Sequence, residues 1–389
     1  MKKPLPKAKL GDVVHDLTVS RTFSVKSDDI IVDPTIQSAT HKISAAATSR
    51  GFEVRVHKRI LIKTGDLVFS RLHTQNGAFA FSEDIFQATG TFVPLEIRTD
   101  RADHRFLFWA LHKFVPSLSA SDTVGRETYK TEDILALEIP LPPLAEQRRI
   151  VARIEELAAQ IHEAQSLRQQ AAQEAEALLK ASLSFCLKDA AKKHGLNKLG
   201  DVAKCAAGFG FPKQYQGKTE GKYPFAKVSD MNLPGNERAV ITANNWVDDD
   251  DVTEMRLKIY PIGTVIFPKI GGAIATNKRR FLARPATFDN NVMGLIPTSD
   301  MLPEYLFCFM QSFDLVELQA GTSVPAISQS KVESLSISVP PLAEQRRIVA
   351  ELDALQAEVD ALKKLQAETA AELDALLPSI LDRAFKGEL

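Results

Sequence analysis

Two segments of the chain carry apolar residues at alternating steps of four and three, which is the heptad spacing of a coiled coil. The first series occupies positions 150, 154, 157, 161, 164, 168, 171, 175, 178 and 182, and the second runs from 348 to 380 with the same steps. Arg168 and Gln366 interrupt the two series at the same place. A polar residue in such a seam costs stability but fixes register, and we assign that role to both.

The chain contains an internal repeat. Residues 142–152, PPLAEQRRIVA, return unchanged as residues 340–350, and weaker echoes relate KLGDV at 9–13 to 198–202 and GDLVFSR at 65–71 to GTVIFPK at 263–269. The Pro-Pro pairs set the first turn of each helix. We therefore predict one unit present twice: a domain at 1–141 with a helix at 142–195, then a domain at 196–339 with a helix at 340–389. A pseudo-two-fold pair of such units favours antiparallel helices.

The globular segments have the pattern of mixed α and β structure. Apolar runs at 66–72, 92–97 and 264–270 stand between Gly, Pro and Asn residues and predict strands. Segments 105–114 and 304–318 carry apolar residues at helical spacing. The predicted fold is α+β, with two mixed domains joined by two long helices that form an antiparallel coiled coil.

Composition is that of an ordinary soluble protein, with 44% hydrophobic and 25% charged residues among 389. No stretch approaches the roughly 18 uncharged apolar residues of a membrane span, and the amino terminus lacks the apolar run of a signal peptide. Three widely spaced cysteines fit a reducing compartment, so we expect a cytoplasmic protein. The net charge of −1 gives no basic excess, so a DNA-binding surface would depend on how charges are sorted in space.

A polar loop follows the same predicted strand in each domain: SRLHTQNG at 70–77 and GGAIATNKRR at 271–280. Arg, Gln and Asn can read base edges, and clustered cations neutralise phosphates. Further candidates lie at 213–218 and 229–232. Ordinary turn chemistry or a solvated charged turn is the alternative in each case. The predicted DNA-binding residues are Arg71, His73, Gln75, Asn76, Lys213, Tyr215, Ser229, Asn232, Lys269, Thr276, Asn277, Lys278, Arg279 and Arg280.

Four arginines open the predicted helices: Arg148 and Arg149 in the first, and Arg346 and Arg347 in the second. Positive charge at a helix amino terminus opposes the helix dipole. We therefore expect these arginines to contact a protein partner or DNA phosphates. Ion pairs with Glu146 or Glu344, or with a domain surface, are the alternative.

Signals of catalysis are weak. The histidines lack metal-ligand spacing, and the aspartate run at 248–251 lacks the spacing of an EF-hand, so we expect a repulsive, solvated loop there. Pro212 stands where a phosphate-binding loop ending in Gly217-Lys218-Thr219 would need glycine. We assign no catalytic residue, metal or cofactor to the chain.

The whole chain resembles a known family in its motifs and in their order. The PPLAEQRRIV block opening a long helix twice, the ending LLPSILDRAFKGEL at 376–389, and the phrases PFAKVSDM at 224–231 and GTSVPAIS at 321–328 are similar to the specificity subunits of type I restriction-modification systems. The first helix departs from this pattern, because it ends FCLKD at 185–189 without the FKGEL terminus. In the first domain, residues 123–128 match the GTSVPAIS phrase only loosely.

The resemblance implies a non-catalytic subunit that binds a bipartite, asymmetric site in double-stranded DNA. Each domain would read one half-site, and the helix pair would act as a ruler. The helices would dock two methyltransferase subunits and, through them, restriction and translocase subunits. S-adenosylmethionine would belong to the methyltransferase partner. Two other hypotheses stay open at this stage: a structural protein whose domains bind protein partners, and a self-contained nuclease.

Overall fold

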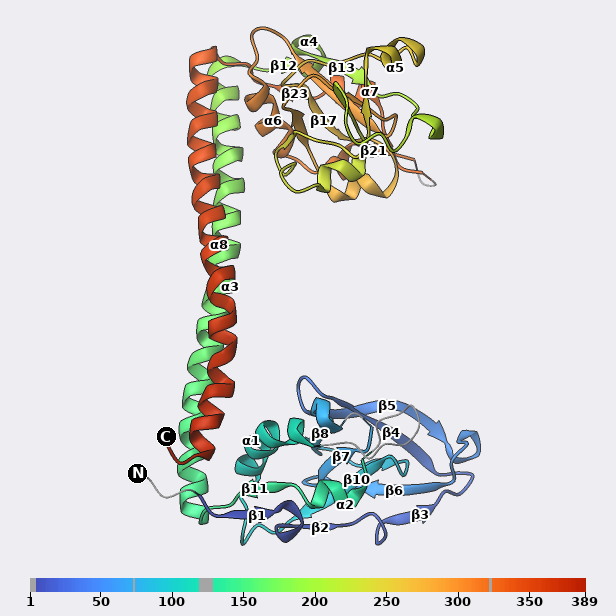
Figure 1. Cartoon of the computed structure of the whole chain (residues 1–389), viewed down its shortest axis with the longest axis vertical. Coiled ribbons are helices and arrows are strands. Elements are labelled where there is room, and N and C mark those ends of the chain that lie inside the picture. Colours follow the sequence, from blue (N-terminus) through green and yellow to red (C-terminus); the bar gives the residue numbers. More distant parts are fainter. Residues whose placement is uncertain (1–4, 73, 119–128, 322–323) are drawn as a thin grey trace. The chain divides into compact units, whose positions relative to one another are not determined.

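The computed structural model describes residues 5–72, 74–118, 129–321 and 324–389 (Figure 1). The chain divides into two units, each with its own hydrophobic core. Unit 1 comprises Met1–Arg168 and Ala367–Leu389, and unit 2 comprises Gln169–Gln366. Each unit holds one mixed domain together with a part of both long helices.

The domain of unit 1 is built around a four-stranded sheet with the order β2-β10-β7-β8, beside a three-stranded sheet β3-β6-β9 and the pairs β4-β5 and β1-β11. Its strands are β1 Lys7–Lys9, β2 Val14–Asp16, β3 Thr22–Ser24, β4 Ile30–Gln37, β5 Lys42–Arg50, β6 Lys58–Ile62, β7 Leu67–Ser70, β8 Phe79–Phe81, β9 Phe86–Ala88, β10 Phe92–Ile97 and β11 Glu138–Pro140. Its helices are α1 His104–Phe114 and α2 Thr131–Leu135. The predicted strands at 66–72 and 92–97 are thus present as β7 and β10.

The domain of unit 2 repeats this plan, with a sheet of order β13-β20-β17-β18-β15 beside a three-stranded sheet β16-β14-β19. Its strands are β12 Asn197–Lys198, β13 Ala203–Ala207, β14 Tyr223–Ala226, β15 Ala239–Val240, β16 Trp246–Val247, β17 Val265–Pro268, β18 Arg280–Leu282, β19 Thr287–Phe288, β20 Val292–Pro297, β21 Gln319–Ala320, β22 Ala326–Ile327 and β23 Ser336–Ile337. Its helices are α4 Leu199–Val202, α5 Asp249–Glu254, α6 Pro303–Gln311 and α7 Gln329–Glu333. The strands β13, β20, β17 and β18 correspond in order and pairing to β2, β10, β7 and β8.

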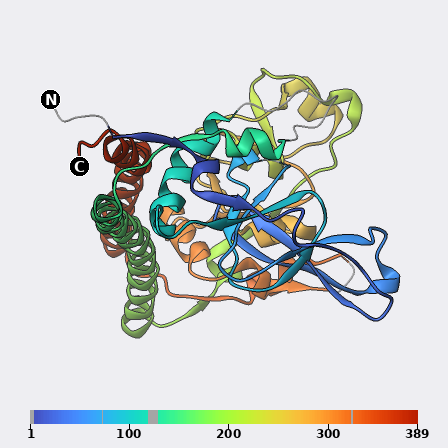
Figure 2. The ribbon, with the colours of Figure 1, turned by 90° about the horizontal axis from the view of Figure 1, so that it is seen from below.

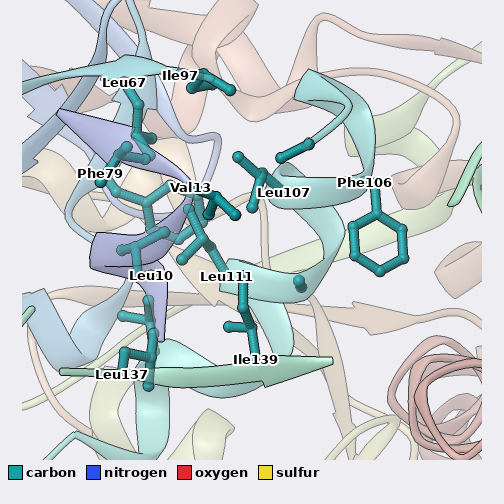
Figure 3. Packing of buried hydrophobic residues seen from close by; sticks show 14 of the residues in the cluster. Leu10, Val13, Leu67, Phe79, Ile97, Phe106, Leu107, Leu111, Leu137 and Ile139 are labelled. Atoms are coloured by element: carbon teal, nitrogen blue, oxygen red, sulfur yellow. The ribbon is translucent and has the colours of Figure 1, made fainter. Parts of the chain in front are cut away.

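The core of the first domain lies between α1 and its main sheet. Asp103 caps α1 by accepting hydrogen bonds from the backbone N–H groups of Arg105 and Phe106. Leu107 and Leu111 project from the helix toward Leu67 and Val13, and all four side chains are fully buried (Figure 3). Helix α6 covers the second sheet in the same way through Tyr305, Leu306 and their neighbours.

The two long helices are α3 Leu144–His194 and α8 Leu342–Phe385, and they pair antiparallel as predicted. In unit 1 the beginning of α3 packs on the end of α8, where Ile150 and Ile154 share a core with Leu381 and Ala384 (Figures 1 and 2). In unit 2 the end of α3 packs on the beginning of α8, where Cys186 and Ala190 share a core with Ile348 and Leu352.

The helix seam departs from strict heptads. Beyond Arg168 the heptad pattern predicts positions 171, 175 and 178 of α3 in the seam, but the less exposed positions are 172, 175 and 179. In α8, position 377 is less exposed than the predicted position 376. Leu178 and Leu376, predicted seam residues, are 56% and 45% exposed. An α-helix has 3.6 residues per turn, so a heptad pattern drifts around a straight helix unless extra steps of four compensate. The heptad prediction was wrong at these two leucines for that reason.

The end of α8 completes the core of the first domain. The Phe385 ring lies 5.5 Å from both Phe106 and Phe114 between ring centroids, and Lys113 pairs with Asp382 at 3.2 Å. The end of α3 does the same for the second domain through Cys186 and Ala190. Each domain is therefore closed by the helix of the other copy as well as by its own.

Two further expectations were wrong. The helix predicted at 304–318 ends at Gln311, and Asp314 then caps a separate 3-10 turn at Leu315–Leu318. The aspartates at 248–251 open helix α5 instead of forming a repulsive loop. Negative charge is favourable at a helix amino terminus, and Lys218 and Lys222 neutralise the run through ion pairs of 2.6–3.0 Å with Asp248, Asp249 and Asp251.

Candidate DNA interface

The predicted loops of the two domains emerge from the same edge of equivalent sheets. In the first domain β7 ends at Ser70, opposite Phe92 at the start of β10. In the second, β17 ends at Pro268, opposite Val292 at the start of β20. Because the strands are antiparallel, the loops after β7 and β17 lie beside the loops that precede β10 and β20. The sheet therefore presents several loops together in each domain.

In the second domain this edge brings together segments that are distant in sequence. The backbone N–H of Phe209, after β13, donates to Phe288 O at 2.9 Å, and Asp289 N donates to Ala226 O at the end of β14 at 3.0 Å. A Cβ added at Gly208 would lie 1.8 Å from Asp289 O, so only glycine fits this approach. The short 3-10 helix η6 Val228–Asn232 follows β14 and contacts the loop after β17 through Asn232.

Lys278 and Asn232 meet in this region, because the Lys278 Nζ donates to Asn232 Oδ1. Ser229 and Asn232 are exposed, and Lys269 and Lys278 are half-buried. These four predicted residues carry donors and acceptors that suit bases or phosphates. Two candidate segments that the sequence presents separately are therefore neighbours.

Arg279 and Arg280, two further predicted contacts, donate hydrogen bonds to loop backbone. Arg279 is 5% exposed, and its guanidinium donates to the backbone oxygens of Asn277 and Phe313. Burial lowers the pKa of Arg279 to about 10. Arg280 donates to the backbone oxygens of Asn236 and Met231, and burial lowers its pKa too. Both guanidiniums hold loops together, and contact of either arginine with DNA stays a prediction.

Asn277 and Thr276 also serve the loop itself. Asn277 has a left-handed backbone (φ 57°), and its Oδ1 accepts from Leu315 N at 2.9 Å and from Arg279. The Thr276 hydroxyl donates to Ala273 O at 2.6 Å, closing the 3-10 helix η7 Gly271–Thr276. Both residues are exposed, so their remaining polar atoms can still face a ligand.

In the first domain the loop after β7 is tied to the beginning of α2 and to Tyr129 before it. The Arg71 Nη2 donates to Thr131 Oγ1 at 2.8 Å, and the Tyr129 hydroxyl donates to Gln75 Oε1. Gln75 and Asn76 lie on the 3-10 helix η3 Thr74–Asn76, and Asn76 is exposed. His73, another predicted contact, lies outside the described residues. Arg71 and Gln75 thus each use part of their hydrogen-bonding capacity to hold the loop in place.

Lys213 and Tyr215 lie on a separate 3-10 turn, Lys213–Tyr215. A hydrogen bond to Glu254 of α5 raises the pKa of the Tyr215 phenol. Lys213 is exposed. These contacts connect the turn to α5 rather than to Lys278 or Asn232.

The arginines that open the long helices form ion pairs nearby. Arg149 pairs with Glu146 at 2.8 Å, which raises the pKa of Arg149, and also donates to Leu389 O at 3.0 Å. Arg347 pairs with Glu351 at 3.1 Å and with Glu344 at 3.7 Å. Arg148 lies 4.0 Å from Asp103, and Arg346 is exposed. Arg148, Arg149 and Arg347 therefore make ion pairs of the alternative kind, Arg148 with the surface of the first domain, and partner contact by the four arginines stays a prediction.

The repeated helix start contains two buried residues that the sequence analysis missed, Gln147 and Gln345. Both are completely buried. The Gln147 Nε2 donates to Arg101 O and Pro142 O at 2.9 and 2.8 Å, and its Oε1 accepts from Asp103 N at 2.8 Å.

Gln345 makes the same three bonds in the second copy. Its Nε2 donates to Asp300 O and Pro340 O at 2.8 and 2.7 Å, and its Oε1 accepts from Leu302 N at 2.8 Å. Each glutamine thus fastens a long helix to the loop that opens α1 or α6. Their identical place in the unchanged repeat was the available signal.

Arg168 and Gln366, the polar residues predicted in the helix seam, are both half-buried. The Arg168 Nη2 donates to Thr369 Oγ1 at 2.7 Å, so Arg168 bonds across the helix pair within unit 1. Gln366 belongs to unit 2. Their role in setting register stays a prediction.

Two general features of the described residues bear on the kind of site. No group of three or more His, Cys, Asp or Glu within them is arranged to hold a metal ion. None of the helices traced there is long and apolar enough to cross a membrane.

Known proteins share this architecture. The sequence profile of the type I restriction modification DNA specificity domain matches residues 7–170 and 195–371. The type I restriction enzyme EcoDI specificity subunit of Escherichia coli is 24% identical over 358 residues, which are 81% of this chain. This chain spans 62–76% of the length of the curated relatives it matches.

Solved structures of related proteins have the same fold. The HsdS subunit from Thermoanaerobacter tengcongensis aligns over 100% of this chain and 98% of its own, with a TM-score of 0.64 and 24% identity. A chain solved in work on complex assembly and conformational transition of the type I R-M system aligns over 100% of both, with a TM-score of 0.74 and 25% identity. The chain belongs to the type I restriction-modification DNA specificity family.

Proposed function

We propose that this chain is the DNA specificity subunit of a type I restriction-modification complex and that each domain reads one half of a bipartite site. The observation that carries the proposal is the repeated sheet edge, where equivalent loops carry different side chains. Asn76 and Gln75 occupy it in the first domain, and Lys269, Lys278 and Asn232 occupy it in the second. Two similar scaffolds with unlike loops predict two unlike half-sites.

The proposal is tested by the salt dependence of DNA binding by the full chain. Each phosphate contact contributes a slope of about 0.9 to the plot of log affinity against log salt. Lys269→Gln combined with Lys278→Gln should therefore lower the slope by about 1.8. Lys198→Gln combined with Lys204→Gln is the matched control. Both lysines are exposed in the same domain, Lys198 on β12 and Lys204 on β13.

Affinity that does not fall as salt rises would refute DNA binding and favour a protein-binding scaffold. DNA cleavage by the purified chain with magnesium alone would instead favour a nuclease. The proposed role is recognition only.

We further propose that the helix pair sets the gap between the half-sites and docks two methyltransferase subunits, which bind S-adenosylmethionine and carry restriction and translocase subunits. The continuity of α3 over 51 residues and of α8 over 44 supports a ruler. The exposed Arg148 and Arg346 occupy equivalent positions at the two helix starts, which suits two copies of one partner.

Arg148→Glu combined with Arg346→Glu should abolish co-purification with the methyltransferase subunit. Arg153→Glu, on the same helix and paired with Glu156 at 2.7 Å, is the control. Unchanged co-purification of the double variant would exclude this docking surface.

A further inference from the structure

The first domain carries a two-stranded ribbon, β4-β5. The equivalent stretch of the second domain has a different structure. Strands β4 and β5 pair antiparallel from Ile30↔Arg50 to Gln37↔Lys42, with a bulge at Asp33/Pro34. Between β13 and β17 the described residues of the second domain hold the 3-10 helix at Lys213–Tyr215, β14, η6, β15, β16 and α5 instead. The ribbon is therefore a feature of one reading domain, in a molecule whose two domains otherwise share their plan.

One face of the ribbon is fixed to the domain. Ile36 and Ile43, opposite each other in the register, pack on a small core of Ile62, Val68, Phe86 and Ala88. Buried Arg59 pairs with Asp33 of β4, and Val32 N donates to Gln87 Oε1 at 2.7 Å. The ribbon is consequently mounted on β6 and β9 rather than free to move alone.

The other face is exposed next to the turn, and residues 34–45 there hold no acidic residue; Asp33, farther along β4, is neutralised by Arg59. Thr35 and Ser44 lie opposite each other, as do Gln37 and Lys42, and because side chains alternate along a strand these four share the outer face. All four are exposed. Arg50 lies opposite Ile30 at the far end of β5, beyond the bulge, and is exposed too. Residues 34–50 contain Lys42 and Arg50 but no Asp or Glu. Short hydroxyl and amide side chains flanked by cations complement the phosphates and base edges of DNA.

The turn of the ribbon adjoins the proposed DNA-reading loop. His41 follows β4, and its Nδ1 lies 3.0 Å from Gly77 O, directly after η3. The His41 ring packs on Phe79 with centroids 4.3 Å apart. Gly77 has φ +83°, and a Cβ there would lie 2.9 Å from His41 Cε1. The close fit makes the ribbon turn and the loop after β7 one continuous surface.

We infer that the β4-β5 ribbon is a second DNA-contacting element of the first domain, and this inference rests on the proposed function. A two-stranded ribbon fits the major groove of B-DNA. Lys42 and Arg50 contact phosphates, while Gln37 and Ser44 face base edges. The first domain thus reads its half-site with both the loop after β7 and the ribbon.

Two variants of the full chain test the phosphate and base contacts separately. Lys42→Gln with Arg50→Gln should lower the salt slope of DNA binding by about 1.8. Lys7→Gln with Lys9→Gln, exposed lysines on β1 of the same domain, should leave the slope unchanged. Gln37→Ala, in the complex with the methyltransferase, should relax one base pair of the first domain's half-site and leave the other half-site intact.

The outcomes separate this inference from the function on which it rests. If Lys269→Gln with Lys278→Gln lowers the slope but the ribbon variants do not, the ribbon inference is overturned and DNA reading stands. If the unaltered chain shows no salt-dependent binding, the proposed function itself fails. Loss of co-purification with the methyltransferase at an unchanged salt slope would mean that the ribbon binds protein, which also overturns the inference.

Discussion

Replacing Gln147 by leucine should weaken the attachment of the first domain to its long helix. Leucine fills a similar volume but offers no polar atom, so the N–H of Asp103 and the carbonyl oxygens of Arg101 and Pro142 lose their partner. A buried polar group left unpaired costs about 1–3 kcal/mol. Since loops can relax around some of these groups, we expect a loss of about 2–4 kcal/mol in the free energy of unfolding of the first domain.

The chain has two tryptophans, and each domain contains one of them: Trp109 on α1 and Trp246 on β16. Fluorescence on a Trp246→Phe background reports the first domain, and on a Trp109→Phe background it reports the second. For a domain of this size, the expected loss lowers the midpoint of thermal unfolding by on the order of 10 °C. Gln147→Leu should lower the Trp109 transition, and Gln345→Leu should lower the Trp246 transition.

The exposed Gln160 of the same helix supplies the control. Gln160→Leu should change stability by no more than about 0.5 kcal/mol, as surface substitutions usually do. If Gln147→Leu behaved like Gln160→Leu, the three hydrogen bonds would not hold the helix to the domain. Equal shifts of both tryptophan transitions would refute the local nature of the attachment.

Three further outcomes are expected. Arg279→Met should destabilise the second domain by about 2–3 kcal/mol because backbone oxygens of Asn277 and Phe313 lose a charged donor; urea unfolding that matches Lys278→Met would contradict this. Burial lowers the pKa of His41 and of His112, and the His41 ring, 5.1 Å away, lowers the pKa of His112 further. The unfolded chain therefore takes up protons first, so stability of the first domain should fall as pH drops below about 6.5, and a His41→Asn, His112→Gln variant that kept the same pH profile would exclude these residues as the cause. Seven residues inserted in both helices, after position 169 in α3 and after 366 in α8, should lengthen the gap in the methylated site by about three base pairs, whereas an unchanged gap would contradict the ruler.

The architecture was predictable because the repeat and the apolar spacing are properties of contiguous sequence. The antiparallel pairing of α3 and α8 followed from the symmetry of two similar units, and β10 occupies the predicted residues. The seam beyond Arg168 was not predictable from heptads, because the true spacing depends on how straight the helices are. Closure of the first core by Phe385 joins it to Phe106, a residue far away in the sequence, and no local pattern records such a contact.

The candidate site was only partly predictable, because residue type does not reveal exposure. Arg279 and Lys278 are adjacent cations in the sequence, yet one is buried against Phe313 and the other reaches Asn232. Gln147 has no chemical signature of its own, and only its place in the unchanged repeat marked it. The ribbon of β4 and β5 escaped notice because its many Ser, Thr and Ala residues give no clear apolar alternation.

The central claim is that two unlike domains each read one half of the DNA site. Its most direct test is genome-wide methylation mapping in cells in which residues 1–141 of this chain have been exchanged for the first domain of another family member. The account predicts that one half-site changes while the other half-site and the gap stay as they were. A change in both halves, or in neither, would contradict it.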